Sequence, residues 1–439
     1  MTGGTRREWP FQNHPFPRMK WKYKWLVVGM LWMVCVLNYG DRQAFFSAFP
    51  RIKGEFGFSP VQFGLMGSAF AWVYAFGSPF AGFLGDRVRR KGLILGGCAF
   101  WSLTTAATGL CGKAWQFVGV RALTGVGEAF YFPSALSLLS DYHDRRTRSL
   151  AFSLHQSGVY VGTIGGSWAG AWLAERYGWR IGFNVFGAAG IVLSLVLYRF
   201  LREPDRGEAG APAAIPGEPP LAPGEALRAI VAKPTALVLM FAFVGANFVA
   251  TIFLAWTPTF LVEKFHLSLT SAGFYGSAFI SVASMLSVPV GGLAADRLSR
   301  TLPGGRILVQ AAGLLAGAVF VAIVGLTGEL ATLVISMTVF GLCKGLYDSN
   351  IFASLYDVVE PRARASAAGV MNTVGWLGGA LGPLAVGFAT QYGRHGSDTS
   401  ANMGEAIAFG AVIYAAGGLA LLLAATVLVR RDFVGSAAA

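Results

Sequence analysis

Long apolar stretches alternate with short charged ones along almost the whole chain. An α-helix needs about 20 mostly apolar residues to cross the hydrocarbon core of a bilayer, and these stretches have that length. The pattern therefore predicts an all-α integral membrane protein with about twelve spanning helices. We expect them near residues 24–48, 59–84, 92–112, 115–140, 148–174, 180–201, 234–261, 270–294, 306–327, 330–356, 364–390 and 403–429.

A polar segment divides the chain into two halves of six helices. Residues 203–233 are rich in Pro, Gly, Ala and Glu, as is typical of a linker, and we expect a short surface helix near 223–233. The predicted organisation is an N-terminal tail (1–23), a first bundle (24–202), this linker, a second bundle (234–429) and a C-terminal tail (430–439).

Composition supports a membrane class. Of 439 residues, 54% are hydrophobic and 13% are charged, whereas soluble domains average about 25% charged. The 58 glycines suit helices that pack closely in lipid. The first apolar stretch is long enough to span, so we expect no cleaved signal peptide. The four cysteines have neither disulfide nor metal-ligand spacing.

The net charge of +13 follows the expected topology and does not indicate nucleic-acid binding. With the N-terminus inside, 25 of the 35 Lys and Arg residues fall in cytoplasmic segments, seven in outer loops and three within the membrane. This positive-inside bias predicts that both termini are cytoplasmic. We expect the protein in the plasma membrane, which in a bacterium is the inner membrane.

Two predicted helices carry charges at positions where lipid contact would be costly. Asp41 and Arg42 interrupt the first helix, and Arg121 and Glu128 lie seven residues apart in the fourth, hence on one face. Each buried charge costs roughly 2.5–3.5 kcal/mol on insertion scales. Paired charges on inward faces favour a polar pathway or binding site. The alternative is a structural ion pair between helices.

The two halves also repeat a motif. Gly82, Asp86, Arg87 and Arg90 follow the second helix, and Gly292, Asp296, Arg297 and Arg300 follow the eighth with the same spacing. Internal duplication of a six-helix unit is typical of secondary transporters.

The chain resembles the major facilitator superfamily over essentially its whole length. The loop after the second helix is similar to the superfamily's G-x-L-x-D-R-x-G-R-R/K motif, with Arg89 in place of the usual Gly. The resemblance implies twelve helices in two pseudo-symmetric bundles. It also implies a cytoplasmic gate that includes Gly82, Asp86, Arg87, Arg90, Asp296, Arg297 and Arg300.

Three segments resemble the anion:cation symporter family, which includes sugar-acid and sialin-like transporters. They are NYGDR (38–42), RALTGVGEAFYFPS (121–134) and WTPTFLVEKFHLSLTSAG (256–273). The resemblance implies that Arg42 and Arg121 bind an organic anion, while Asp41 and Glu128 carry protons. Spinster-like lipid transporters share part of this pattern and are the alternative.

The chemistry of these groups suits such roles. Arginine in a low-dielectric cavity stays charged and presents a planar fork to a carboxylate. A substrate that competes for the arginine would increase the proton affinity of the paired carboxylate, so proton and anion would bind together. Proton symport is the hypothesis; an antiporter can be built from the same parts.

Lys344 and Asp348 lie four residues apart in the tenth helix and share a face. They form either a self-neutralising pair or a second cationic determinant for the substrate, flanked by Tyr347 and Asn350. Further polar residues could line a cavity or simply join helices. These candidates are Tyr39, Tyr74, Tyr131, Gln156, Asn247, Asn372 and Trp376.

Other classes find little support. We find no Walker-type phosphate loop, metal-ligand cluster or nucleophile elbow, so we expect neither an enzyme nor a cofactor. The expected partners are a small organic anion, H⁺ and the bilayer, with the protein acting as a monomer. Multidrug efflux is a further alternative within transport.

Overall fold

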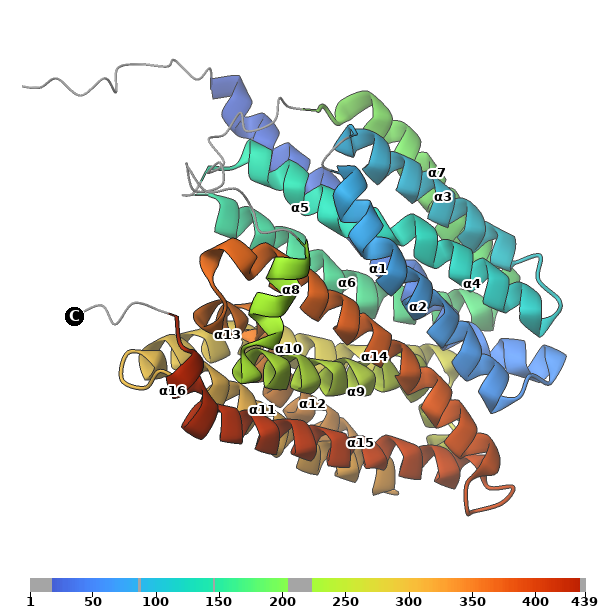
Figure 1. Cartoon of the computed structure of the whole chain (residues 1–439). Helices are drawn as coiled ribbons and strands as arrows, with labels where there is room; N and C mark the ends of the chain where they lie inside the picture. Colours follow the sequence, from blue (N-terminus) through green and yellow to red (C-terminus); the bar gives the residue numbers. More distant parts are fainter. Residues whose placement is uncertain (1–17, 86–87, 145–146, 204–222, 435–439) are drawn as a thin grey trace, which may run out of the picture.

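The computed structural model describes residues 18–85, 88–144, 147–203 and 223–434, and within these ranges all regular structure is helical. The chain forms two bundles, each with six long helical segments, packed side by side in Figure 1. This arrangement confirms the predicted all-α fold class. We call the end where α1 begins and α16 finishes the terminal end, and the opposite end the far end.

The N-terminal half crosses the bundle six times. Its helices are α1 (Arg18–Phe56), α2 (Pro60–Gly85), α3 (Arg90–Thr108), α4 (Ala114–Ala129) with α5 (Tyr131–Tyr142), α6 (Arg148–Arg176) and α7 (Trp179–Phe200). The short helix α8 (Pro223–Val231) confirms the helix expected at the end of the linker.

The C-terminal half repeats the pattern. Its helices are α9 (Pro234–Phe265), α10 (Leu269–Ser299), α11 (Gly305–Leu326), α12 (Leu330–Asp348) with α13 (Ile351–Val358), α14 (Arg364–Tyr392) and α15 (Thr399–Leu423), which continues through a π-helical turn (Ala424–Leu428) into α16 (Val429–Asp432). A 3₁₀ turn (Pro361–Ala363) precedes α14.

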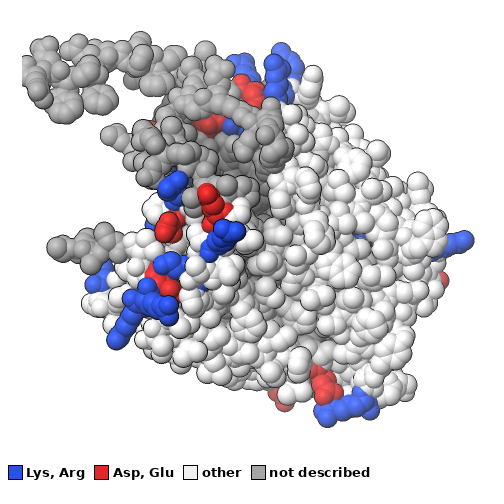
Figure 2. Space-filling view, viewed as in Figure 1, with Lys and Arg blue, Asp and Glu red and all other residues white. Residues whose placement is uncertain are grey.

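Length and apolarity make the bundle suited to a membrane. Eight of the described helical segments are long and apolar enough to cross a bilayer on those criteria alone. In Figure 2, charged side chains gather towards the two ends of the molecule and leave a broad uncharged belt between them. Four of the twelve long segments do not meet these criteria, and all four belong to the N-terminal half: α2, α3, α4–α5 and α6.

Two of the predicted helices are broken near their middle. The fourth predicted helix divides at Phe130 into α4 and α5, and Pro133 explains the break, because it cannot donate to the carbonyl of Ala129 and its ring clashes there. The tenth divides into α12 and α13 at Ser349 and Asn350, residue types that compete with the helix for backbone hydrogen bonds. Each break follows the charged residues of its helix within two residues.

Close packing of small residues fixes α1 against α6. Gly158, Gly162, Gly166 and Gly170 recur every four residues along one face of α6. A Cβ on Gly162 would lie 2.5 Å from the carbonyl oxygen of Val36, and one on Gly170 would lie 2.5 Å from the Cα of Ala44. A Cβ on Gly166 would overlap the backbone of Gly40, so the two helices touch directly beside Asp41 and Arg42.

Contacts between the two halves concentrate at the far end. Lys53 of α1 pairs with Glu263 of α9 at 2.5 Å, and the hydroxyl of Ser167 in α6 donates to the carbonyl of Gly273 in α10 at 2.7 Å. Midway along the bundle, Tyr74 of α2 contacts Trp376 of α14, with 4.7 Å between ring centroids. Among the described residues, the hydrogen bonds and ion pairs between halves all lie on the far side of this contact. The halves are therefore locked together at the far end.

Adding one methyl group at the α1–α6 contact should separate these helices. We expect Gly166→Ala to destabilise the protein by roughly 1–3 kcal/mol, the usual cost of overpacking. Gly165→Ala is the matched control, because its Cβ would meet nothing within 4 Å and alanine favours the helix. Thermal unfolding of both purified variants in detergent is the measurement. Equal midpoints for the two variants would contradict the packing role.

Candidate functional site

A cluster of four charged side chains is buried inside the N-terminal half. Asp41 and Arg42 come from α1, and Arg121 and Glu128 come from α4; each is at most 7% exposed. The Arg42 Nε donates to the Glu128 Oε2 and forms a buried ion pair. The Arg42 Nη2 also donates to the Asn38 Oδ1 at 3.2 Å. Arg42 is thus the direct partner of Glu128.

Aromatic rings enclose the Arg42 guanidinium. Its central carbon lies 4.6 Å from the ring of Tyr39, 4.7 Å from Phe70 and 5.0 Å from Tyr74, measured to the ring centroids. Trp376 of the other half adds a fourth ring at 5.6 Å. Cation–π attraction strengthens when the cation is desolvated, so these rings stabilise the charge and connect it to the C-terminal half.

Arg121 has aromatic neighbours but a less complete set of hydrogen-bond partners. Its guanidinium carbon lies 4.7 Å from the Phe45 ring, 5.5 Å from Phe46 and 4.6 Å from Phe70. The Nε and Nη2 atoms are buried and have no hydrogen-bond partner among the described residues. Buried arginine N–H groups without acceptors are costly, and they are suited to bind an anionic oxygen.

The two carboxylates each have an oxygen without a partner. Thr105 of α3 donates its hydroxyl to the Asp41 Oδ2 at 3.3 Å, whereas Asp41 Oδ1 and Glu128 Oε1 are buried without a partner in the part of the chain described. Both carboxylates lie within electrostatic range of both arginines. The four groups therefore form one electrostatic unit.

The polar residues of the C-terminal half have different environments. Lys344 pairs with Asp348 within α12, which is the self-neutralising geometry considered above. The Asn350 amide donates to the carbonyl of Gly291, and the Asn247 amide to the carbonyl of Phe243. These two amides serve as helix–helix or intrahelical connections in this conformation.

The remaining predicted site residues are scattered. Tyr131 donates to the carbonyl of Leu31 and also contacts His155, so it belongs to the packed interior of the N-terminal half. Tyr347 is buried in the core of the C-terminal half. Gln156 is exposed and Asn372 is half-buried. The structure thus brings Tyr39, Tyr74 and Trp376 to the charged cluster, but not these four.

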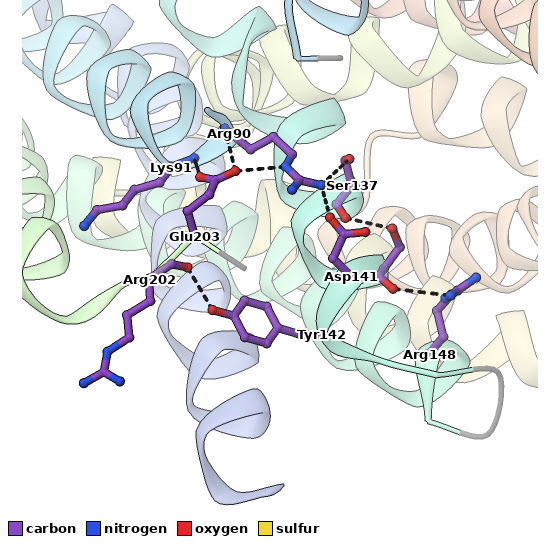
Figure 3. A network of polar contacts seen from close by, with 9 residues as sticks. Arg90, Lys91, Ser137, Asp141, Tyr142, Arg148, Arg202 and Glu203 are labelled. Carbon is purple, nitrogen blue, oxygen red and sulfur yellow. Dashed lines mark hydrogen bonds and ion pairs between the residues drawn. The ribbon is translucent and has the colours of Figure 1, made fainter. Parts of the chain in front are cut away.

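A second polar network closes the terminal end of the N-terminal half (Figure 3). Arg90, the first residue of α3, forms ion pairs with Asp141 of α5 and, at 3.1 Å, with Glu203. Glu203 also accepts the backbone N–H groups of Arg90 and Lys91 at 3.1 and 2.7 Å. A carboxylate at a helix N-terminus is favoured both by these N–H groups and by the helix dipole.

The predicted gate motif is only partly within the described residues. Gly82 lies in α2, while Asp86 and Arg87 fall outside the described ranges. In the C-terminal half, Arg297 and Arg300 are exposed near the end of α10.

The structural counterpart of Arg90 is a residue that the sequence repeat did not identify. Arg306 is the second residue of α11 and pairs with Asp357 at 2.7 Å and with Asp296 at 3.1 Å. Arg90 lies four residues after Asp86, whereas α10 continues past Asp296 to Ser299 and α11 begins only at Gly305, so equal spacing from Asp296 leads to Arg300 and misses Arg306. Both arginines lie within the first two residues of their helices, Arg90 in α3 and Arg306 in α11.

The comparisons with known proteins agree with this architecture. The model of the Major Facilitator Superfamily matches residues 31–383, and the chain belongs to that superfamily. A solved bacterial homologue of the human lysosomal transporter Spinster, in an inward-facing and unoccupied conformation, superposes with a TM-score of 0.83 at 23% identity and covers 94% of this chain and 99% of that one.

Curated relatives come from two groups of transporters. A probable chloroplastic anion transporter 4 of rice is 26% identical over 84% of this chain and 64% of its own length. Human protein spinster homolog 1 is 31% identical over 67% of this chain and 59% of its own length. The hexuronate transporter of Bacillus subtilis is 26% identical over 84% and 88%. The alignments with the first two thus span about three fifths of those relatives.

These findings settle the class of protein. The chain is an integral membrane protein of a superfamily of transporters and not an enzyme, as the composition and repeat predicted.

Replacing Arg90 should remove the cation that pairs with both Asp141 and Glu203. The Arg90 and Asp141 side chains are 4% and 7% exposed, and breaking a buried pair costs about 3–5 kcal/mol. We therefore expect Arg90→Met to lower the unfolding midpoint clearly. Arg89→Met is the control, because the neighbouring Arg89 is exposed. The network would have no structural role if the two variants unfolded alike.

Proposed function

We propose that this protein is a secondary active transporter that carries a small organic anion together with a proton by alternating access. The observation that supports this most strongly is the buried cluster itself. It contains two arginines and two carboxylates, and the Nε and Nη2 groups of Arg121, which have no partner among the described residues, suit an anionic oxygen.

Charge balance within the cluster explains why an anion and a proton would bind together. With all four groups ionised, the formal charges of the cluster cancel. An anion that entered alone would leave one uncompensated negative charge in a region of low dielectric constant, which is costly. Uptake of one proton by Asp41 or Glu128 restores neutrality. A monoanion should therefore travel with one proton.

An exchange of ion-pair partners at Arg42 can couple binding of the anion to uptake of the proton. Glu128 pairs with Arg42 in this conformation. Arg121 lies seven residues before Glu128 in α4, which is about two helical turns. A substrate carboxylate that binds Arg121 and attracts Arg42 would weaken the hold of Arg42 on Glu128. The released carboxylate would then accept the proton, so each ligand increases the affinity for the other.

The conformational change follows from the same contacts. The far end is closed by contacts between halves that reach as far as Tyr74 and Trp376, and Trp376 also lies over Arg42. A shift of Arg42 therefore changes a contact between the halves. We propose that this contact links occupancy of the site to opening of the far end.

The positive-inside bias favours a cytoplasmic terminal end and an external far end, in the plasma membrane, with the protein acting as a monomer. On this orientation the structure represents a state closed to the outside.

A spinster-like lipid carrier is the second candidate, because human protein spinster homolog 1 is the most identical of the relatives described above. A lysolipid would also need an apolar wall beside the charged cluster. Competition between a short-chain acid and a lysolipid for the purified protein distinguishes the two candidates.

Neutralising the carboxylates should separate transport from coupling. Asp41→Asn and Glu128→Gln should each abolish accumulation driven by a pH gradient in proteoliposomes, and at least one should retain substrate exchange without a gradient. Glu405→Gln at the exposed far end is the control and should accumulate normally. If both cluster variants still accumulate substrate under the gradient, neither carboxylate carries the proton.

Replacing the arginines should discriminate between charged and neutral ligands. Loss of a bidentate contact in a desolvated site costs roughly 2–5 kcal/mol, or a factor of about 30 to several thousand in affinity. Arg42→Lys and Arg121→Lys keep the charge but lose the fork, so they should weaken binding of an acid more than binding of its amide. Calorimetric binding of the matched acid and amide is the measurement. Equal losses for the two ligands would mean that the arginines only hold helices together.

A further inference from the structure

The Lys344–Asp348 pair differs from the Arg42–Glu128 pair in its access to solvent. The side chains of Lys344 and Asp348 are 24% and 26% exposed, whereas those of Arg42 and Glu128 are 8% and 0% exposed. The Lys344–Asp348 pair is therefore partly accessible, whereas other side chains enclose the Arg42–Glu128 pair.

Both pairs lie at one depth in the bundle. Arg42 is about 14 residues from the far end of α1, Glu128 about 14 residues from the start of α4, and Lys344 about 14 residues from the start of α12, so each is about 21 Å from the far end at 1.5 Å per residue. Helix α12 ends at Asp348, and α4 ends one residue after Glu128. The two halves thus present a charged pair each at the same level.

Lys344 and Asp348 also face the other half. Tyr160, from α6 of the N-terminal half, lies within electrostatic range of both charges. Within the C-terminal half, Tyr414 of α15 and Tyr347 lie within electrostatic range of Asp348. The Tyr414 hydroxyl is buried and has no hydrogen-bond partner among the described residues. The pair is therefore partly exposed and has a tyrosine hydroxyl nearby that could serve as a further hydrogen-bond donor.

A partly exposed Lys344–Asp348 pair favours one kind of chemical group in a ligand. The ammonium of Lys344 has three donors and the carboxylate of Asp348 has about four lone-pair sites, so one mutual contact leaves most of them available. A carboxylate of a ligand would meet repulsion from Asp348, and an alkyl chain would leave both charges without polar partners. Neighbouring hydroxyls fit, because each can donate to the carboxylate and accept from the ammonium.

We propose that Lys344 and Asp348, with Tyr160, form a subsite that binds the hydroxyl groups of a polyhydroxylated monocarboxylate. The inference rests on the proposed function, in which the carboxylate of the same ligand binds the arginine cluster. A ligand held by both halves at one level would draw them together at the terminal end, as alternating access requires.

The test uses three six-carbon probes with the purified full-length protein: a hexuronate, hexanoate and adipate. The variant is the double substitution Lys344→Met/Asp348→Leu, which removes both charges and leaves neither one buried alone. The control is Arg394→Met/Glu405→Leu, which removes an exposed ion pair at the far end of the same half.

We expect the Lys344→Met/Asp348→Leu variant to bind the hexuronate about 10- to 100-fold more weakly than wild type while its affinity for hexanoate changes less than about threefold. The control should match wild type for all three probes. An equal loss for hexuronate and hexanoate, no loss for either, or wild-type preference for adipate would overturn the subsite. Failure of wild-type protein to bind any of the three acids would instead refute the proposed function.

If the double variant unfolds, Tyr160→Phe gives a second test, since it removes only one hydroxyl from a half-buried position. It should weaken hexuronate binding severalfold without affecting hexanoate. Equal affinities of Tyr160→Phe and wild type for the hexuronate would exclude Tyr160 from the subsite.

Discussion

The buried ion pair between Arg42 and Glu128 is the interaction on which the organisation of the N-terminal half depends. Arginine keeps its charge in any environment found in proteins, so a helix that places one in an apolar bundle must provide an anion or aromatic faces. This protein provides both: a carboxylate from α4, and rings from α1, α2 and α14. Since a buried pair is not in itself a source of stability, its presence favours a functional role over a purely structural one.

Backbone packing determines where these charges meet. The glycines of α6 bring its backbone against α1 at Gly40, beside Asp41 and Arg42. Gly125 and Gly127 have a similar role in α4: a Cβ on Gly125 would lie 2.6 Å from the carbonyl of Phe70, and one on Gly127 would lie 2.9 Å from the Phe100 ring. Close approach on both sides leaves little room for the charged side chains to adopt other orientations. The small residues thus preorganise the site without contacting a ligand.

Much of this arrangement could be predicted from the sequence, because hydrophobic length and charge position are local properties. The spanning segments, the division into two halves and the burial of Arg42, Arg121 and Glu128 all follow from them. The identity of the partners could not be predicted in this way. Helical spacing places Arg121 and Glu128 on one face, but the nearest cation to Glu128 comes from another helix, which only tertiary packing decides.

Other features of the structure could not be predicted from the spacing of residues along the sequence alone. Pro133 accounts for the break after α4, although the apolar stretch continues through it. The pairing of Arg306 with Asp357 depends on where α11 begins, so a repeat aligned on the preceding loop selects Arg300 instead. The rings of Phe45, Phe46 and Phe70 around Arg121 resemble ordinary apolar positions until the fold brings them together.

In the proposed mechanism, the cluster takes up a proton when it binds an anion. Proton uptake by the purified protein in weakly buffered detergent solution, measured with a pH indicator as substrate is added, tests it without transport. We expect uptake of about one proton for each monoanion bound, and no uptake when both Asp41 and Glu128 are replaced by their amides. Saturating substrate binding to the wild-type protein without proton uptake would contradict it.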